Sequence, residues 1–285
     1  MRESNTGFIL ALPSIMILFI LFAAPLVLII IFSFQQPYSF DINSVPTIEN
    51  YAIFFSDGYY KSLGWSVFLS MITVFISFLF AYPCAYGMVK IFPRYTLWIA
   101  LLIAMPMFVS SGIRLFGWTL ILQKGGFLPY LLSWIPGIVH IDFLYHIPAI
   151  VLGLVYIYGP FMLFPLILGI QMVDEEAREA AVDLGASRWS VLIEVELPMA
   201  AAGIFFGALL VFVTSLGTIV EAQILGGGAV VPFSDDMYHA FAMQQNWPLG
   251  SSLAVIMLII TLVLIVVIMH YVDLDKLLGS RAKLG

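Results

Sequence analysis

Six stretches of this chain are long and apolar enough to cross a lipid bilayer as helices. They cover residues 7–34, 62–89, 95–122, 146–172, 200–222 and 251–272. A membrane-spanning helix needs about 20 mostly apolar residues, whereas a barrel strand would show about 10 residues of alternating hydrophobicity. The stretches therefore predict an all-α integral membrane protein with six transmembrane helices.

The composition excludes the main soluble classes. Hydrophobic residues make up 62% of the 285 residues, and charged residues only 10%, against about 25% in an ordinary soluble domain. A soluble core of this length could not bury so much apolar surface. The net charge of −6 argues against nucleic acid as a partner, because nucleic-acid binding needs basic patches.

The basic residues predict the orientation of the spans. With the N-terminus inside the cell, eight of them fall in inner segments and only Lys61 and Lys124 in outer ones. The positive-inside rule then places both termini in the cytoplasm. The eight inner residues are Arg2, Lys90, Arg94, Arg178, Arg188, Lys276, Arg281 and Lys283.

The inner segment between the fourth and fifth spans, residues 174–198, is unusually long for a connection. Asp174 and the acids after it suit a helix N-terminus, and Gly185 can end that helix as a C-terminal cap. Ser187 can cap a second short helix that ends near Pro198. The segment therefore predicts two short helices, with an ordinary interfacial loop as the alternative. Arg178 can offset the local negative charge through Asp174 and Glu175.

The same segment resembles the EAA signature of permease subunits in bacterial ABC importers. The resemblance rests on Glu179-Ala180-Ala181, then Gly185 after three intervening residues, and then Val195-x-Leu197-Pro198 after nine more. Val195 stands where isoleucine is more usual. The resemblance implies a type I permease fold, with one permease domain over residues 1–285. It also implies an N-terminal helix at 7–34, a five-helix core over about 62–272 and an EAA loop at 173–198.

In that family, the EAA loop forms coupling helices that dock on a cytoplasmic ATPase. By resemblance, the ATPase-coupling residues would be Glu179, Ala180, Ala181, Asp183, Gly185, Ala186, Leu197 and Pro198. The implied partners are a second permease subunit, two copies of the ATPase, a periplasmic solute-binding protein and membrane lipid. ATP and Mg²⁺ would bind the ATPase, with no cofactor on this chain, and the complex would lie in the bacterial inner membrane.

Weaker motifs point to a subgroup and its cargo. The segments 111–117, 225–227 and 246–250 resemble permeases of the spermidine/putrescine importer group, and residues 47–51 resemble a segment common in the superfamily. The resemblance implies a polyamine as the solute. Related importers carry opines, phosphonates, iron or thiamine, and these remain alternatives.

Ionisable and aromatic residues in or near the spans are candidates for the translocation path. They are Arg114, Trp118, Tyr156, Tyr158, Glu221 and Gln223. A charge in hydrocarbon must be paired or hydrated, so Arg114 is expected to pair with an acid or to cap backbone carbonyls. Glu221 could hold a cationic solute, or could lie just outside the bilayer. The aromatic rings could bind a cation or simply pack.

Other chemistry is missing from the sequence. It holds no phosphate-binding G-x-x-x-x-G-K-[ST] loop, no H-E-x-x-H and no G-x-S-x-G. His140 and His146 have a poor spacing for zinc, and Asp235 and Asp236 read as a solvated outer pair. The chain is therefore not expected to be an enzyme. An ATPase-independent transporter or channel is the main rival, but such a protein has no reason to carry an EAA loop.

Overall fold

The described part of the chain is helical, and no strand is assigned within it. In this computed structural model, residues 2–41, 45–132, 134 and 142–271 are described. The chain divides into two compact units, one formed by Met1–Lys61 with Asp235–Leu262, and the other by Ser62–Ser234 with Val263–Gly285. The assignment of all 285 residues to one permease domain stays a prediction.

Four helices are long and apolar enough to span a membrane by themselves. They lie in α1 (Arg2–Ser33), in α3 (Tyr59–Tyr86) with its π-helical continuation η1 (Gly87–Ile91), in α7 (Ile147–Gln171) and in α14 (Trp247–Tyr271). Two bent helix pairs raise the number to six if each pair counts as one span. The all-α fold with six spans is thereby confirmed.

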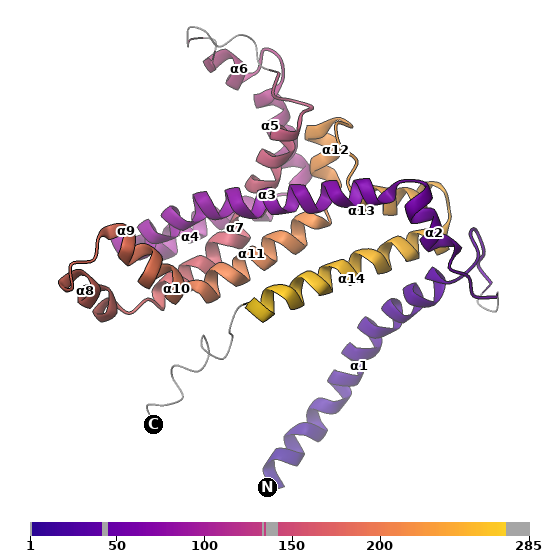
Figure 1. Ribbon diagram of the computed structural model, residues 1–285, viewed down its shortest axis with the longest axis horizontal. Coiled ribbons are helices and arrows are strands. Elements are labelled where there is room, and N and C mark those ends of the chain that lie inside the picture. The colour runs from indigo at the N-terminus through magenta and orange to yellow at the C-terminus, as the bar shows by residue number, and fades with distance from the viewer. Residues whose placement is uncertain (1, 42–44, 133, 135–141, 272–285) are drawn as a thin grey trace. The chain divides into compact units, whose positions relative to one another are not determined.

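The third expected span, residues 95–122, is not one straight helix. Its first part is α4 (Thr96–Ala104), preceded by the short turn η2 (Pro93–Tyr95) and extended by the 3₁₀ turn η3 (Met105–Phe108). The second part is α5 (Ser111–Leu122), followed by α6 (Phe127–Leu132), at an angle of 95° (Figure 1). The chain turns because Val109 and Ser110 have extended ψ angles near 138°.

The fifth expected span, residues 200–222, ends early. Helix α11 covers Ala201–Leu216, which is 16 residues and about 24 Å. A separate helix, α12 (Val220–Gly226), begins after a break. The break is partly buried: Thr218 is about 1% exposed, like Ser215 and Leu216 before it, whereas Gly217 is exposed. Irregular backbone at membrane depth is tolerated where protein surrounds it.

Helices α7 and α11 form the centre of the larger unit, and their backbones touch. A Cβ atom built on Gly203 would lie 2.8 Å from the Gly169 Cα atom, and it would also collide with the Pro165 carbonyl oxygen. Small residues allow such close approach in membrane proteins. Around this contact, buried Met162 and Leu166 of α7 pack with Ala81 of α3.

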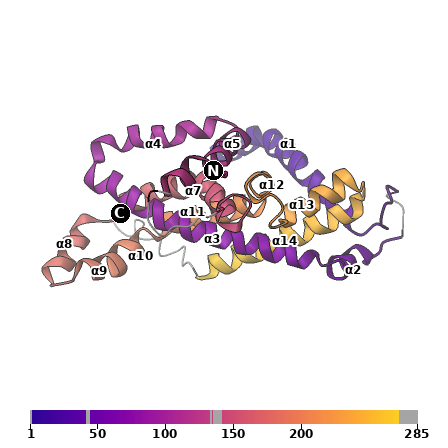
Figure 2. The ribbon, with the colours of Figure 1, turned by 90° about the horizontal axis from the view of Figure 1, so that it is seen from above.

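Figures 1 and 2 show what lies at the two ends of this pair. The short helices α8 (Glu175–Asp183), α9 (Arg188–Val191) and α10 (Leu197–Met199) group at one end, and α12 lies toward the other. The EAA loop and the break after α11 are therefore two separate places in the same unit.

In the smaller unit, two motifs act as local caps. The Asn50 amide of α2 (Glu49–Ser56) donates to the carbonyl oxygens of Ser33 at 3.3 Å and Gln35 at 2.6 Å, just where α1 ends. The Asn246 Oδ1 atom accepts from the backbone N–H groups of Tyr38 at 3.1 Å and Leu249 at 3.3 Å. Asn50 thus binds a carbonyl at the end of α1 and Asn246 an N–H in the first turn of α14, where helices leave backbone groups unpaired, and each also binds a backbone group of the loop after α1.

Candidate functional site

The EAA loop has the two capped helices that its sequence predicts. The Asp174 carboxylate accepts from the Glu176 N–H at 3.0 Å and caps α8. Gly185, with φ at +86°, ends the helix in a Schellman motif: its N–H donates to the Val182 carbonyl, and the Ala186 N–H donates to the Ala181 carbonyl. The Ser187 hydroxyl caps α9 by accepting from the Ser190 N–H at 3.2 Å.

The second helical segment continues beyond α9. It passes through a five-residue π-helix, η4 (Leu192–Glu196), and then α10, and meets α11 at a bend of 70°. The expected end near Pro198 is confirmed within one residue. A π-helical turn often marks a functional site.

The residues expected to contact an ATPase lie together on this loop. Glu179, Ala180, Asp183, Gly185 and Pro198 are exposed, and Ala181, Ala186 and Leu197 are half-buried. Large apolar side chains stand beside them, with Leu184 89% and Trp189 72% exposed. An exposed apolar patch rimmed by charges is typical of a protein-binding surface.

An ion-pair network ties the loop to the end of α3. The Lys90 Nζ atom lies 2.6 Å from Glu175 Oε2, and the Nε and Nη2 atoms of Arg178 each lie 2.5 Å from Glu175 Oε1. Hydrogen bonds from Lys90 and then Arg178 hold the pKa of the Glu175 carboxyl below its ordinary value. The bond to Glu175 likewise raises the pKa of Arg178. The predicted offset by Arg178 is confirmed at Glu175, whereas the contact from Lys90 is new.

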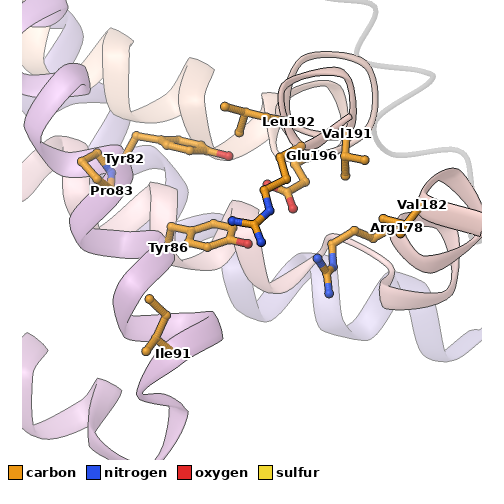
Figure 3. A pocket seen from close by; sticks show the side chains of 10 residues that line it. Tyr82, Pro83, Tyr86, Ile91, Arg178, Val182, Val191, Leu192 and Glu196 are labelled. Atoms are coloured by element: carbon orange, nitrogen blue, oxygen red, sulfur yellow. The ribbon is translucent and has the colours of Figure 1, made fainter. Parts of the chain in front are cut away.

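A cavity of about 700 Å³ lies behind this network (Figure 3). Figure 3 shows the rings of Tyr82 and Tyr86, from α3, on one side of it and Arg178 reaching in from α8. Glu196 of η4 contributes a carboxylate and is only 6% exposed. The remaining lining residues are Pro83, Ile91, Val182, Arg188, Val191 and Leu192. Sequence reasoning missed Glu196, whose only signal is an acid at a position facing the core.

A second polar cluster lies at the break between α11 and α12. Glu221 is 4% exposed. Its Oε1 atom accepts from the Tyr158 hydroxyl at 3.2 Å, and its Oε2 atom accepts from the Thr218 hydroxyl. The Ser234 hydroxyl in turn donates to the Thr218 carbonyl oxygen, which compensates for the interrupted helix. Glu221 is thus enclosed by protein, and the expectation that it lies just outside the bilayer stays a prediction.

Arg114, a residue of α5, lies against another face of α7. Its guanidinium stands 5.7 Å from the centre of the Tyr156 ring, and Trp118 packs edge-on against the same ring at 5.5 Å. Tyr156 and Tyr158 are two residues apart, which is about 200° around a helix. The path candidates therefore divide into two groups, and within the described residues no ion pair joins Arg114 to Glu221. Gln223 is exposed on α12.

The expected pairing of Arg114 with an acid or a carbonyl is wrong for the described part of the chain. The Arg114 Nε atom is buried there without a hydrogen-bond partner. The side chain lines a mostly apolar cavity of about 400 Å³ between α3, α4, α5 and α7. An aromatic face replaces the counter-charge, because the ring quadrupole attracts cations.

The remaining candidates lie elsewhere. Asp235 is buried and Asp236 half-buried in α13 (Phe233–Tyr238), so the interpretation as a solvated pair is wrong. His140 lies outside the described residues, and the His146 ring nitrogen Nδ1 lies 2.9 Å from the Leu144 carbonyl oxygen. Among the described residues, no three His, Cys, Asp or Glu side chains form a group that could hold a metal.

The motif at residues 225–227 has a packing role. Gly227 has φ at +53°, and a Cβ atom there would collide with the Tyr145 ring. The Tyr145 N–H donates to the Leu225 carbonyl at 2.8 Å. The glycine thus lets the turn before α7 pack on the end of α12.

Comparisons with known proteins place the chain among transport proteins. No family model matches it. It is 34% identical to the spermidine/putrescine transport system permease protein PotB of Haemophilus influenzae, over 84% of this chain and 82% of that protein. It is 27% identical to PotB of Escherichia coli, over 85% and 88%. Its fold matches a bacterial alginate ABC transporter, solved with its periplasmic protein, with a TM-score of 0.72, 18% identity and 94% coverage of both chains.

Proposed function

Because this chain belongs to the family of spermidine/putrescine ABC transport permeases, we propose that it passes a polyamine such as spermidine or putrescine across the bacterial inner membrane. The permease would receive the solute from a periplasmic binding protein, and a separate subunit would hydrolyse ATP. The 34% identity to a PotB protein over most of both chains carries this proposal.

Glu221 is the favoured contact for the solute. A polyamine is a flexible chain of ammonium groups, and a buried carboxylate with nearby hydroxyls can replace the water around one of them. Glu221 also lies at a break in a spanning helix, and transporters commonly bind their solute at such breaks. Tyr158 then has two roles, donating to Glu221 and offering a ring face to the ammonium group.

The EAA loop is the favoured contact for the ATPase. Leu184 and Trp189 stand out from a loop that carries the signature residues. One ATPase copy would bind this loop, and a second copy would bind the corresponding loop of a second permease subunit. The loop would face the cytoplasm, as would both termini, in agreement with the distribution of basic residues. Exposed apolar side chains on the spans contact lipid or the second permease.

Transport would proceed by alternating access. ATP and Mg²⁺ bind the ATPase pair, which closes and moves the EAA loops. The spans then open toward the periplasm, the solute enters, and hydrolysis resets the complex. In this scheme the chain itself binds no cofactor and catalyses no reaction.

One observation favours a second class of cargo. The unpaired Arg114 guanidinium lines a cavity of about 400 Å³, which suits an anionic or zwitterionic solute such as a phosphonate or an opine. A competition assay with the purified importer separates the two classes. Spermidine uptake that resists an excess of phosphonate and opine supports the polyamine.

Two substitutions test coupling to the ATPase. Gly185→Val forces a β-branched residue into a left-handed conformation, and Glu179→Lys reverses an exposed charge of the signature. Each is expected to lower uptake about tenfold or more, while membrane insertion is kept. Uptake by proteoliposomes and ATP hydrolysis are measured together.

Matched controls accompany these variants. Gly64→Val adds the same side chain where φ is not positive and nothing lies within 4 Å of the added Cβ, and Glu194→Lys reverses another exposed charge of the loop. Normal coupled uptake by the Gly185 and Glu179 variants would contradict the proposed role of the loop. A purified chain that never retains an ATPase would favour an ATPase-independent transporter.

A further inference from the structure

Glu196 is a buried acid that the proposed function does not use. It is 6% exposed, and within the described residues its carboxylate has no hydrogen bond or ion pair. A buried charge without a partner is costly. The side chain faces the cavity behind the EAA loop, together with Arg178 and Arg188. Glu196 therefore has no directly bound cation from the described part of the chain in this state, although its charge acts on Arg178 through space.

The lining of the cavity indicates where that cation comes from. A free anion entering the cavity would meet Glu196, and a free cation would meet two guanidinium groups. The mixed charges disfavour both kinds of small ligand and favour a partner from within the chain. Arg178 lines the cavity from α8, on the side opposite the α3 rings (Figure 3), and the charge of Glu196 already acts on it through space.

Arg178 is occupied in the present state. It binds Glu175, which also holds Lys90 at the end of α3. The pair is half-exposed to water, and such pairs contribute little to stability. Glu175 can therefore release Arg178 at small cost, whereas the buried Glu196 would gain strongly from receiving it.

The position of Glu196 decides which segment Arg178 would reach if it moved from Glu175 to Glu196. It is the last residue of the π-helix η4, three residues before the end of α10 and the 70° bend into α11. Arg178 and Glu175 both lie on α8, so their bond stays within that helix, and it is Lys90 that ties Glu175 to η1 after α3. An Arg178 bound to Glu196 would link α8 to the segment that leads into α11.

We propose that Arg178 is the mobile member of a charge exchange in the EAA loop, bound to Glu175 in the state described here and to Glu196 after α8 has moved. This inference rests on the proposed function, because the ATPase supplies the movement of α8. The exchange joins α8 to the segment that leads into α11 during each transport cycle, while the Lys90–Glu175 bond to η1 is kept.

Two isosteric substitutions are expected to act in opposite directions. Glu175→Gln removes the resting partner of Arg178 and is expected to raise ATP hydrolysis without solute about fivefold. Glu196→Gln removes the second partner and is expected to lower hydrolysis stimulated by the loaded binding protein about fivefold. Both are measured on the assembled importer in lipid nanodiscs, with Glu194→Gln as the control on the exposed face of the same segment.

Further variants separate the exchange from a structural role. Lys90→Gln keeps the Arg178–Glu175 bond and is expected to leave the rates closer to wild type than Glu175→Gln does. In an Arg178→Gln background, neither glutamine substitution should change the rates further, because the exchanging group is gone. An effect of Glu196→Gln that persists in this background, and vanishes with Arg188→Gln, would overturn the role of Arg178.

The outcomes distinguish this inference from the proposed function. If the ATPase assembles with the wild-type chain and both glutamine variants change hydrolysis in the same direction, the exchange is refuted and the permease function stands. If no ATPase assembles with the wild-type chain, the proposed function fails first. Opposite effects that disappear in the Arg178→Gln background would establish the exchange.

Discussion

Gly203→Ala is expected to destabilise the protein by about 3 kcal/mol, the upper end of the usual range for overpacking. The added Cβ would lie 2.8 Å from the Gly169 Cα atom and would also collide with the Pro165 carbonyl oxygen. Both obstacles are backbone, which cannot move aside as a side chain can. Helices α7 and α11 would have to separate, and the buried cluster around Met162 would open with them. Thermal unfolding in detergent, followed by size-exclusion chromatography, measures the effect.

Gly159→Ala is the matched control for this prediction. Gly159 lies in α7 as well, but a Cβ there meets nothing within 4 Å. Alanine is a better helix former than glycine by up to about 1 kcal/mol, so this variant should be as stable as wild type or more so. Equal midpoints for Gly203→Ala and wild type would show that α7 and α11 do not approach as closely as described.

The second large effect is expected at Glu221. Glu221→Gln keeps the shape and a hydrogen-bonding oxygen but removes the charge that would hold an ammonium group. Uptake of spermidine is expected to fall about 100-fold, which corresponds to about 3 kcal/mol for a charged hydrogen bond. Most of the loss should appear as weaker apparent affinity for spermidine. Radiolabelled uptake into proteoliposomes over a range of spermidine concentrations measures this.

Two companion variants make the Glu221 result specific. Glu221→Ala additionally leaves the hydroxyls of Tyr158 and Thr218 without their acceptor, and is expected to lose about 1–3 kcal/mol of stability as well. Thr214→Val removes a hydroxyl whose hydrogen bonds to described residues all stay within its own helix, and this variant should transport normally. Wild-type affinity in Glu221→Gln would exclude this carboxylate as a solute contact.

Local signals in the sequence predict the EAA loop well. Asp174, Gly185 and Ser187 each act within one helical turn, since each caps a backbone group two to five residues away. Such contacts depend on residue type and spacing alone. The signature and the caps are thus consistent with one another, and the two short helices are predicted nearly to the residue.

Breaks within the spans are harder to predict. Pro160 and Pro165 both lie inside α7, which stays continuous, whereas the break beyond Pro106 turns the chain by 95°. All three positions carry the same residue type, so a proline in an apolar stretch does not by itself separate a continuous helix from a break. The early end of α11 at Leu216 has no proline beside it to mark it.

Contacts between distant residues could not be predicted from periodicity. Lys90 and Glu175 are 85 residues apart, and Tyr158 and Glu221 are 63 apart. Periodicity indicates which face of a helix is apolar, but not which helix covers it. The same limit explains Arg114, for which an acid was the expected partner and an aromatic ring is the observed one.

The backbones of α7 and α11 meet at Gly169 and Gly203, with no side chain between them. A tilt of α7 relative to α11 about this contact would therefore not require side chains to move past one another there. Tyr158 stands 11 residues along α7 from this point, about 16 Å at 1.5 Å per residue. A tilt of about 10° carries it through about 3 Å, which is as long as its hydrogen bond to Glu221. A small tilt of α7, produced by movement of the EAA loop, would therefore be enough to break and re-form the hydrogen bond between Tyr158 and Glu221.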